Sequence, residues 1–419
     1  MAAVDLNVQS EIGKLEGVIL HKPGAEVENM TPQTAQRALY SDILNLSIAQ
    51  REYEQLNGVL SKYTKVYYVE ELLASLLENY RERERLIGRI CIEEEVTDYF
   101  DYLMEMSSAQ LAKSLIEGVP ARINTLTAYL KEEYYALYPL YNFYFTRDAS
   151  VTIGNNALIC RMANKVRMRE SLIMEAIFKS PAFNCSIINA HDFHPGNADI
   201  YMEGGDILIA RDDILLIGNG MRTSTQGIDM LISRLLKDRS EKKRHVIVQQ
   251  LPNSPESFIH LDMVFTLLDK DKCMVFEPLI LGNNQYQTVH MELEGGKVTG
   301  IKSVRNIPWA LKQLGMDLQP VSCGGTTDLW NQEREQWHSG ANFFALAPGK
   351  VLSYARNIHT LNELDKNGFS ILSAWDVIDG KRDIADYERC VVTIDGSELP
   401  RGGGGARCMT MPISRGNII

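Results

Sequence analysis

Cysteine is scarce in this sequence, and the few cysteines present are not arranged to pair. There are seven, scattered along the chain and without a C-x-x-C spacing. Such an odd, dispersed set supports neither a disulfide framework nor a zinc site, and it is typical of a reducing compartment. The one close pair of histidines, in HDFH at 191–194, is not joined by a cluster of further ligands. The sequence therefore predicts no bound metal.

Long apolar runs and an excess of positive charge are also lacking. No stretch of about 18 apolar residues occurs, and the N-terminal MAAVDLNVQSEIGKLEG has neither the basic start nor the apolar core of a secretory signal. The 43 Lys and Arg residues are outnumbered by 54 Asp and Glu, for a net charge of −11. This balance argues against binding to nucleic acid or to an anionic membrane. We expect a cytoplasmic protein that could attract a cationic small molecule.

The chain is long enough for more than one domain, at 419 residues. From about Glu70 to Tyr138 its apolar residues follow helical spacing, and SSAQLAKSLIEG has serines suited to cap a helix and a glycine, Gly118, suited to end it. The texture on either side is one of short strands and turns. We predict an α/β domain formed by 1–70 and 139–419, with an inserted helical domain at 71–138.

A strand–turn–strand pattern recurs four times outside the helical segment. It occurs in FTRDASVTIGNNALICR, MEGGDILIARDDILLIGN, HLDMVFTLLDKDKCMVFE and GANFFALAPGKVLSYARN, and each is a hairpin by its turn residues and apolar content. Helical patterns, RESLIMEAIFK and GIDMLISRLLKD, follow the first two. A repeating hairpin-plus-helix unit favours a closed, propeller-like ring, which would protect the strand edges.

Polar residues stand where each of these hairpins begins. If the units surround an axis, such residues would converge on one mouth. His260 and Asp262, two positions apart, would share a face if they lay on a strand. Taken singly, each motif is better explained by structure: a histidine bonded to backbone, a glycine turn beside solvated acids, or a surface ion pair. The residues that we expect to converge are Asp148, Glu203, Asp206, His260, Asp262 and Cys408.

Several carboxylates with one thiol and one imidazole suit a planar guanidinium substrate, whose five donors carboxylates accept in pairs. A thiolate is a strong enough nucleophile for its central carbon, and a protonated histidine could protonate departing ammonia. Clustered carboxylates would raise the pKa of the Cys408 thiol, so we expect activation by His260 or by the arriving cation. Arg167 and Arg222 could hold the α-carboxylate of an amino-acid substrate.

The motifs as a set resemble those of arginine deiminase. NFYFTRD, EGGD, HLDMVFTLLD and the terminal CMTMPISR carry the resemblance, with LHKPG near the start and IGNGMRTS also matching. The similarity runs from Leu20 to Arg415. It implies a pentein fold, an α/β propeller of five ββαβ modules with a helical insertion, and hydrolysis of L-arginine to L-citrulline and ammonia without a metal or organic cofactor. A dimer or tetramer would be compatible with it.

The resemblance also assigns roles. Cys408 would be the nucleophile that forms an amidino-thioether, and His260 the general acid and base, supported by Glu203. Asp148 and Asp262 would clamp the guanidinium. Substrate-binding positions would be Asn142, Phe145, Arg167, Arg222 and Gly402.

The glycine-rich run RGGGGARC departs from part of the family. Some members carry an arginine five residues before the cysteine, where this chain has Gly403. Arg401 is the candidate to replace it. Because glycines allow close backbone approach and cheap rearrangement, we expect 402–405 to form a lid that is mobile when empty and ordered with arginine bound.

Three other functions stay open at this point. An agmatine deiminase or a dimethylarginine hydrolase would share the fold, but would not need both carboxylate-binding arginines or would usually lack the helical insertion. A Cys-His-Asp amide hydrolase would use an oxyanion hole in place of two guanidinium-binding aspartates. An inactive binding or structural protein would not need Cys408, His260 and the three acids together.

Overall fold

The computed structural model describes residues 3–35, 40, 42–123, 125–130, 134–192, 200–237 and 243–418 of the chain. Within these ranges no helix is both long and apolar enough to cross a bilayer. Of the close histidine pair, His194 lies outside the described residues. His191 is bonded through Nε2 to the Cys160 carbonyl at 3.1 Å, which is an ordinary structural role.

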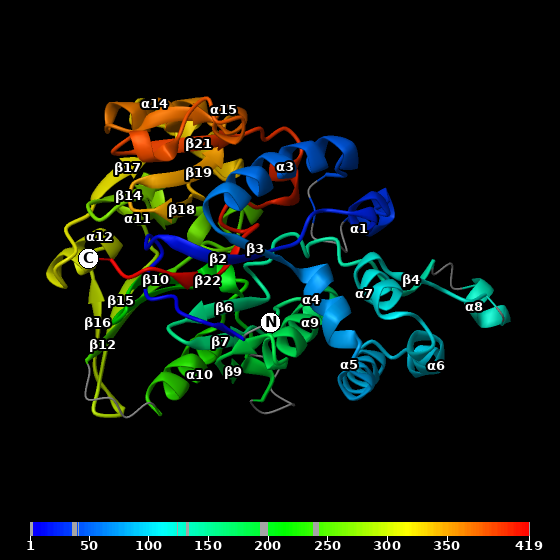
Figure 1. The fold of residues 1–419 in the computed structure, drawn as a ribbon. Coiled ribbons are helices and arrows are strands. Elements are labelled where there is room, and N and C mark those ends of the chain that lie inside the picture. Colours follow the sequence, from blue (N-terminus) through cyan, green and yellow to red (C-terminus); the bar gives the residue numbers. More distant parts are fainter. Residues whose placement is uncertain are drawn as a thin grey trace.

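Five sheets repeat one arrangement, in which an antiparallel pair of strands is extended by a third strand parallel to the second (Figure 1). Four of the antiparallel pairs are the hairpins predicted from sequence, and all four are confirmed. Listed as neighbours across each sheet, the three strands are β6 (Ser150–Ile153), β7 (Asn156–Ile159) and β9 (Ser186–Asn189); β10 (Ile207–Arg211), β11 (Ile214–Asn219) and β12 (Arg244–Gln250); β13 (Phe265–Leu267), β14 (Lys272–Val275) and β17 (Gln319–Ser322); β18 (Phe344–Ala347), β19 (Lys350–Tyr354) and β21 (Cys390–Ile394); and β22 (Met411–Arg415), β2 (Leu15–Leu20) and β3 (Lys65–Tyr68).

Helices connect the second and third strands of each unit, as a parallel connection requires. The two predicted helices after the first two hairpins are confirmed as α9 and α10. The connecting helices are α9 (Met168–Lys179), α10 (Thr225–Leu235), α11 (Glu277–Ile280) with α12 (Ile307–Gln313), α14 (Ile358–Lys366) and α3 (Leu46–Tyr63). The additional elements are α1 (Ala25–Glu28), α2 (Pro32–Ala35), α13 (Leu329–Trp337), α15 (Ala374–Ile378), β1 (Val4–Asp5), β8 (Phe183–Asn184), β15 (Thr288–Glu294), β16 (Lys297–Val304) and β20 (Ser370–Ser373).

The fifth unit is assembled from both ends of the chain. Its antiparallel pair joins β22 to β2, with Met411 opposite Ile19 and Arg415 opposite Leu15. In Figure 1 the red C-terminal strand β22 lies beside the dark blue strand β2. This pairing could not be read as a hairpin, because no short turn connects its strands.

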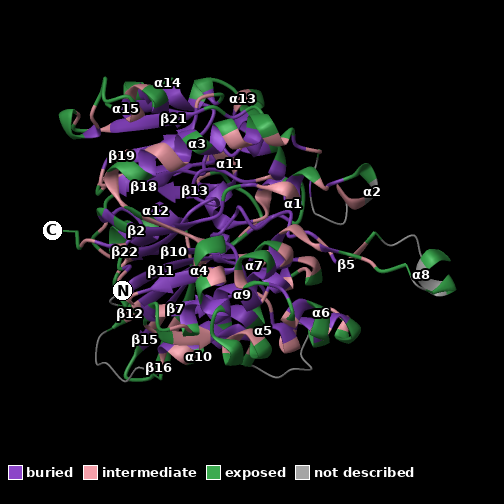
Figure 2. Ribbon diagram, turned by 45° about the vertical axis from the view of Figure 1, so that its right-hand side comes forward, coloured by how far each residue is buried: buried purple, intermediate pink, exposed green. Residues whose placement is uncertain are grey.

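The segment after β3 is helical, with a strand pair at its far end. Its helices are α4 (Val69–Leu77), α5 (Tyr80–Glu93), α6 (Phe100–Met104) and α7 (Ser108–Glu117). The side chain of Ser107 caps α7 by accepting from the Gln110 N–H, and Gly118 ends it with φ +96°, as the sequence indicated. The segment is not helical throughout, however. The strands β4 (Val119–Pro120) and β5 (Tyr135–Leu137) pair and carry α8 (Leu126–Leu130) away from the body (Figures 1 and 2).

The helical segment shares its core with the first sheet unit. Buried Leu73, Ile87 and Leu115 from the helices join one apolar cluster with Val151 and Leu158 of β6 and β7. Figure 2 shows the strands buried at the centre of the molecule and the exposed faces of the helices outside. The sheets are therefore covered on their outer sides, and the loops before the first strands are free to form a site.

Candidate active site

The residues just before the first strand of each unit meet at one place. These positions carry Asp148, Asp206, Asp262, Asn342 and Cys408. Asn342 Nδ2 lies 3.2 Å from Cys408 Sγ, Cys408 Sγ lies 3.7 Å from Asp262 Oδ2, and Asp206 Oδ1 accepts from the Leu261 N–H at 2.9 Å. The thiol thus occupies, in the fifth unit, the position that carries aspartate or asparagine in the other four.

A nearly closed pocket covers this place. It holds about 30 Å³, room for only one or two water molecules. Eight of the eleven predicted site residues line it, Glu203 and Asp262 lie directly behind it, and Arg401 is outside. The lining residues are Asn142, Phe145, Asp148, Arg167, Arg222, Ile259, His260, Gly402, Gly403, Gly404 and Cys408.

The thiol of Cys408 is 3 % exposed. Burial raises its pKa well above the ordinary range, and the negative charges of Asp262 and Asp148 raise it further. Asn342 donates to Sγ through Nδ2, while its Oδ1 accepts from the Arg407 N–H at 2.9 Å. Without a cation in the pocket, Cys408 is therefore a protonated and well-positioned thiol.

Two buried carboxylates each keep one oxygen without a hydrogen-bond partner among the described residues. Asp148 pairs through Oδ2 with Arg167 Nη1 at 2.8 Å, and Asp262 pairs through Oδ2 with Arg407 Nη1 at 2.8 Å. Among the described residues, Asp148 Oδ1 and Asp262 Oδ1 have no hydrogen-bond partner. Such orphaned acceptors are costly to bury unless a ligand completes them. They offer a cation two acceptors beside the thiol.

His260 forms the third part of the site. Its Nε2 lies 3.0 Å from Glu203 Oε2, and its Nδ1 lies 3.8 Å from Asp148 Oδ1. Burial alone would lower the imidazole pKa, but Asp148 and the hydrogen bond to Glu203 raise it to about 9. His260 is thus a cation at neutral pH and can release a proton.

A short turn and a close glycine contact, rather than a regular strand, position His260 and Asp262. His260 and Asp262 do not lie on a strand, as the sequence pattern had suggested, because residues Leu261–Met263 form a short 3₁₀ turn ahead of β13. Gly205 in EGGD has an ordinary φ, but a Cβ there would lie 2.5 Å from His260 Nδ1. The glycine is required for the approach of the imidazole rather than for a turn.

The two predicted carboxylate-binding arginines differ in availability. Arg167 donates from Nε and Nη2 to Glu170, from Nη1 to Asp148 and from Nη2 to the Asn142 carbonyl. Arg222 has one long contact, Nη1 to Glu203 Oε1 at 3.4 Å. Arg222 therefore has donors to spare toward an anionic group of a ligand, whereas Arg167 is largely committed to the protein.

The glycine-rich run packs tightly against the pocket. A Cβ on Gly402 would lie 1.9 Å from the Tyr144 hydroxyl, and one on Gly404 would lie 2.5 Å from the Phe145 ring. Gly403 has φ +88° and faces open space. Arg401, by contrast, points away from the pocket and forms ion pairs with Asp42 and Glu398.

Sequence reasoning missed two contributors to this site. Asn342 was not among the predicted site residues, although it begins the fourth predicted hairpin, and that position in the repeat was the signal that it belonged with the others. Arg407 was not predicted to belong to the site. It is buried, pairs with both oxygens of Glu11 at 3.0 Å, and holds Asp262; nothing in the local sequence indicates a partner 396 positions away.

Donor atoms of Asp148, Glu203 and His260 lie within 4.8 Å of one another, a grouping that could hold a metal ion. The same carboxylates face guanidinium groups, however. Arg167 Nη1 lies 2.8 Å from Asp148 Oδ2 and 3.7 Å from Glu203 Oε2. Because Arg167 already places positive charge against these carboxylates, we expect a singly charged organic cation to fit this donor set better than a metal ion of higher charge.

Comparison with known proteins agrees with this geometry. Residues 36–415 match the family described as arginine deiminase. The chain is 34% identical to an arginine deiminase of Bacillus cereus over 99% of both chains, and 31% identical to one of Mycoplasma capricolum over 99% of this chain and 98% of that one.

Solved structures share the fold at low sequence identity. The substrate-bound N-terminal domain of ArgZ, described as an arginine dihydrolase from the ornithine–ammonia cycle in cyanobacteria, superposes with a TM-score of 0.52 at 13% identity, covering 96% of this chain and 99% of that one. The amidinotransferase SxtG from Microseira wollei gives 0.51 at 13% identity, over 99% and 98% of the two chains. The solved structures share the mixed α/β fold, and the family match and its curated relatives make the chain a hydrolase that acts on C–N bonds of amidines.

The chain belongs to the arginine deiminase family.

Proposed function

We propose that this protein hydrolyses L-arginine to L-citrulline and ammonia, as the first step of arginine breakdown by the deiminase pathway. The observation that carries the proposal is the pair of orphaned oxygens, Asp148 Oδ1 and Asp262 Oδ1, beside a buried thiol. A guanidinium between them would satisfy both acceptors with charge-assisted hydrogen bonds. Its positive charge would also offset the two carboxylates that raise the pKa of Cys408, so binding would favour the thiolate.

The chemistry then follows in two displacements. As the cation binds, the Cys408 thiol releases its proton to solvent; Sγ then bonds to the guanidinium carbon, His260 protonates one terminal nitrogen, and the C–N bond breaks to release ammonia. Neutral His260 next takes a proton from water, whose oxygen bonds to the same carbon while the C–S bond breaks. The products are the ureido group of citrulline and the restored thiol, and no redox partner is needed.

The pocket in its present form is too small for arginine, so the glycine-rich lid has to move for the substrate to be admitted. Residues 402–404 line the pocket, and a Cβ on Gly402 or Gly404 would clash with Tyr144 or Phe145; this close packing supports a lid that covers the pocket. We place substrate recognition in Asn142, Phe145, Arg167, Arg222 and Gly402. Arg401 is left out of this set, because its ion pairs lie on the outer side of the lid.

The proposed fold is a pentein propeller of five ββαβ units. The repeated strand order and the closure of the fifth unit by β22 and β2 support it. We further propose that residues 71–138 are an insertion in a catalytic domain formed by 1–70 and 139–419, that the protein acts in the cytoplasm without a cofactor, and that assembly as a dimer or tetramer is compatible with this arrangement.

Preference for arginine over agmatine tests the proposed substrate. We expect kcat/KM for L-arginine to exceed that for agmatine by roughly 10²-fold or more, because agmatine lacks the carboxylate that the spare donors of Arg222 would bind. Arg222→Gln should lower kcat/KM for arginine and leave that for agmatine nearly unchanged. Measurement of ammonia and of the ureido product decides it, and faster turnover of agmatine by the wild type would contradict the assignment.

Replacement of Glu203 by glutamine should shift the alkaline limit of activity. The first displacement needs protonated His260, so kcat/KM is expected to fall as the pH rises through about 9, the pKa of that imidazole. Glu203 helps to raise this pKa. Removal of its negative charge should therefore move the alkaline fall of kcat/KM to lower pH by about one unit. A pH profile of kcat/KM shows the shift; an unmoved limb would rule out the His260–Glu203 coupling. The exposed Glu93→Gln serves as control.

A further inference from the structure

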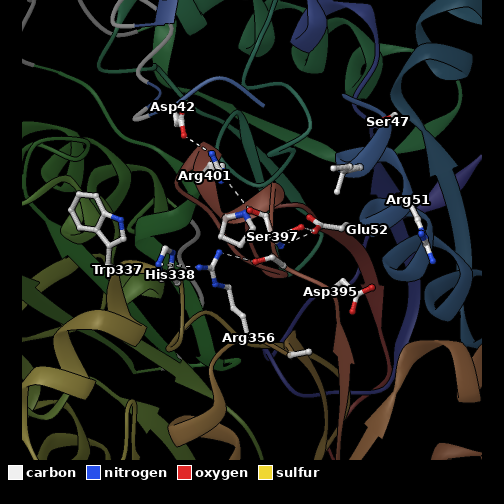
Figure 3. A pocket seen from close by; sticks show the side chains of 14 residues that line it. Asp42, Ser47, Arg51, Glu52, Trp337, His338, Arg356, Asp395, Ser397 and Arg401 are labelled. Atoms are coloured by element: carbon white, nitrogen blue, oxygen red, sulfur yellow. Dashed lines mark hydrogen bonds and ion pairs between the residues drawn. The ribbon is translucent and has the colours of Figure 1, made fainter. Parts of the chain in front are cut away.

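The glycine-rich run that covers the pocket is anchored on both sides. Before the run, the buried carboxylate of Glu52 on α3 accepts the backbone N–H groups of residues 397–399 (Figure 3). After the run, Asn342 Oδ1 accepts the N–H of Arg407 at 2.9 Å. An opening motion is therefore confined to the stretch between these anchors, which contains the lid at 402–405.

A tyrosine of the fourth unit reaches the lid between these anchors. Tyr354 is the last residue of β19, and its hydroxyl donates to the Gly404 carbonyl at 3.0 Å. Gly404 lines the pocket, and a Cβ on it would lie 2.5 Å from the Phe145 ring. The hydrogen bond thus holds the lid at a residue that forms the wall of the pocket.

The donor of this hydrogen bond lies on a rigid element, whereas the acceptor lies on a glycine-rich loop. β19 is hydrogen-bonded to β18 on one side and to β21 on the other, and Tyr354 is paired with Ile394 of β21. Tyr354 is 1 % exposed, and a Cβ on Gly396 would lie 2.7 Å from its ring, so the ring has little room to turn. Burial raises the pKa of the hydroxyl well above its ordinary value, which keeps it protonated as a donor.

We propose that Tyr354 is a positioning residue whose hydroxyl latches the lid shut over Cys408. The pocket of about 30 Å³ is too small for arginine, so each opening of the lid has to break the hydrogen bond to Gly404. The strength of this bond therefore sets how often the thiol is accessible. Tyr354 is not one of the residues that line the pocket, so it acts through the lid. The inference rests on the proposed function for the identity of the ligand that enters.

Alkylation of Cys408 in the free protein tests the latch without any arginine turnover. Iodoacetamide reaches the buried thiol when the lid is open, so Tyr354→Phe should raise the alkylation rate by about two- to tenfold, the effect of losing one hydrogen bond. The factor should be the same at every pH, because the variant leaves in place the two carboxylates that raise the thiol pKa. Mass spectrometry of the peptide that contains Cys408 measures the rate.

Tyr68→Phe is the matched control for this measurement. It also removes one hydroxyl that donates a hydrogen bond, to Asn57 Oδ1 at 2.7 Å, but Tyr68 does not line the pocket and lies on β3. The control should alkylate at the wild-type rate. An unchanged rate in Tyr354→Phe, or a factor that varies with pH, would overturn the latch.

Hydrogen exchange separates a latch from a general loosening of the fourth sheet. Tyr354→Phe should speed exchange in peptides that cover the lid, residues 402–405, and leave β19 and β21 with wild-type protection. Equal acceleration in the two strands would mean that the ring only packs the sheet, and it would contradict the proposal.

Stopped-flow binding of L-arginine connects the latch with the proposed substrate. In a Cys408→Ser background, whose turnover should be strongly reduced, Tyr354→Phe should raise the association and dissociation rate constants by similar factors and leave Kd within about twofold, because the hydrogen bond breaks on entry and on exit. A rise in the dissociation rate constant alone would mean that Tyr354 holds the bound ligand, and it would refute the latch. If arginine does not bind at all, the proposed function fails, while alkylation and hydrogen exchange still decide the latch.

Discussion

Replacing Cys408 with serine is expected to lower the rate of citrulline formation from L-arginine by roughly 10⁴-fold or more. A serine hydroxyl is a far weaker acid than a thiol, and the surroundings of Cys408 already oppose ionisation through burial and two nearby carboxylates. The base strength available at His260, whose pKa is about 9, does not compensate for that difference. Citrulline and ammonia assays on wild type and variant measure the loss.

The same variant separates covalent from direct hydrolysis. Wild-type enzyme quenched with acid during turnover of radiolabelled arginine should retain label on the protein, and Cys408→Ser should not. Cys185→Ser is the matched control, because Cys185 is partly exposed and does not line the pocket. Robust turnover by Cys408→Ser would overturn the amidino-thioether mechanism.

The lone thiol also explains a feature of the five-unit repeat. In four units the residue before the first strand is an aspartate or asparagine that accepts or donates hydrogen bonds, and in the fifth it is Cys408, the proposed nucleophile. Cys408 is thus surrounded by polar neighbours that position it, with Asn342 at 3.2 Å, and by charges that keep it protonated until a cation arrives. In the proposed mechanism, the arriving substrate therefore activates the nucleophile.

Local patterns were sufficient to predict the four hairpins, α9 and α10, because turn residues and apolar spacing act over short stretches. They were not sufficient for the fifth unit, whose strands β22 and β2 come from opposite ends of the chain. They also gave a wrong local geometry for His260 and Asp262, since the 3₁₀ turn before β13 has no strong signal of its own. Contacts between distant parts of the chain determine both the β22–β2 pairing and the turn at 261–263.

Individual residues of the site were predicted where a motif marked them, and missed where a distant partner defined them. The motifs around Asp148, Glu203 and His260 identified groups that the structure brings to one pocket. Arg407 pairs with Glu11 and also holds Asp262 in place. No sequence spacing connects these three positions. Arg401 shows the opposite case, since nearness in sequence to Cys408 did not place it in the pocket.

Replacement of Asp262 by asparagine is expected to lower kcat/KM for arginine by roughly 10²- to 10⁴-fold, because loss of one partner of a buried charge pair costs about 3–5 kcal/mol. The side chain keeps its size, and Arg407 retains both oxygens of Glu11 at 3.0 Å, so the fold should survive. Thermal unfolding checks this, with the exposed Asp317→Asn as control. An amide hydrolase, which would need no guanidinium clamp, should lose much less activity.

Reactivity of Cys408 toward neutral iodoacetamide provides an opposite readout in the same variant. Asp262 helps to raise the pKa of the thiol, so Asp262→Asn should lower that pKa and increase the alkylation rate at pH 8 while arginine turnover collapses. A distorted site would slow both reactions, and a carboxylate without influence on the thiol would leave alkylation unchanged. Faster alkylation together with lost turnover requires that Asp262 acts on the substrate cation, because the variant then has a better nucleophile and yet a poorer enzyme.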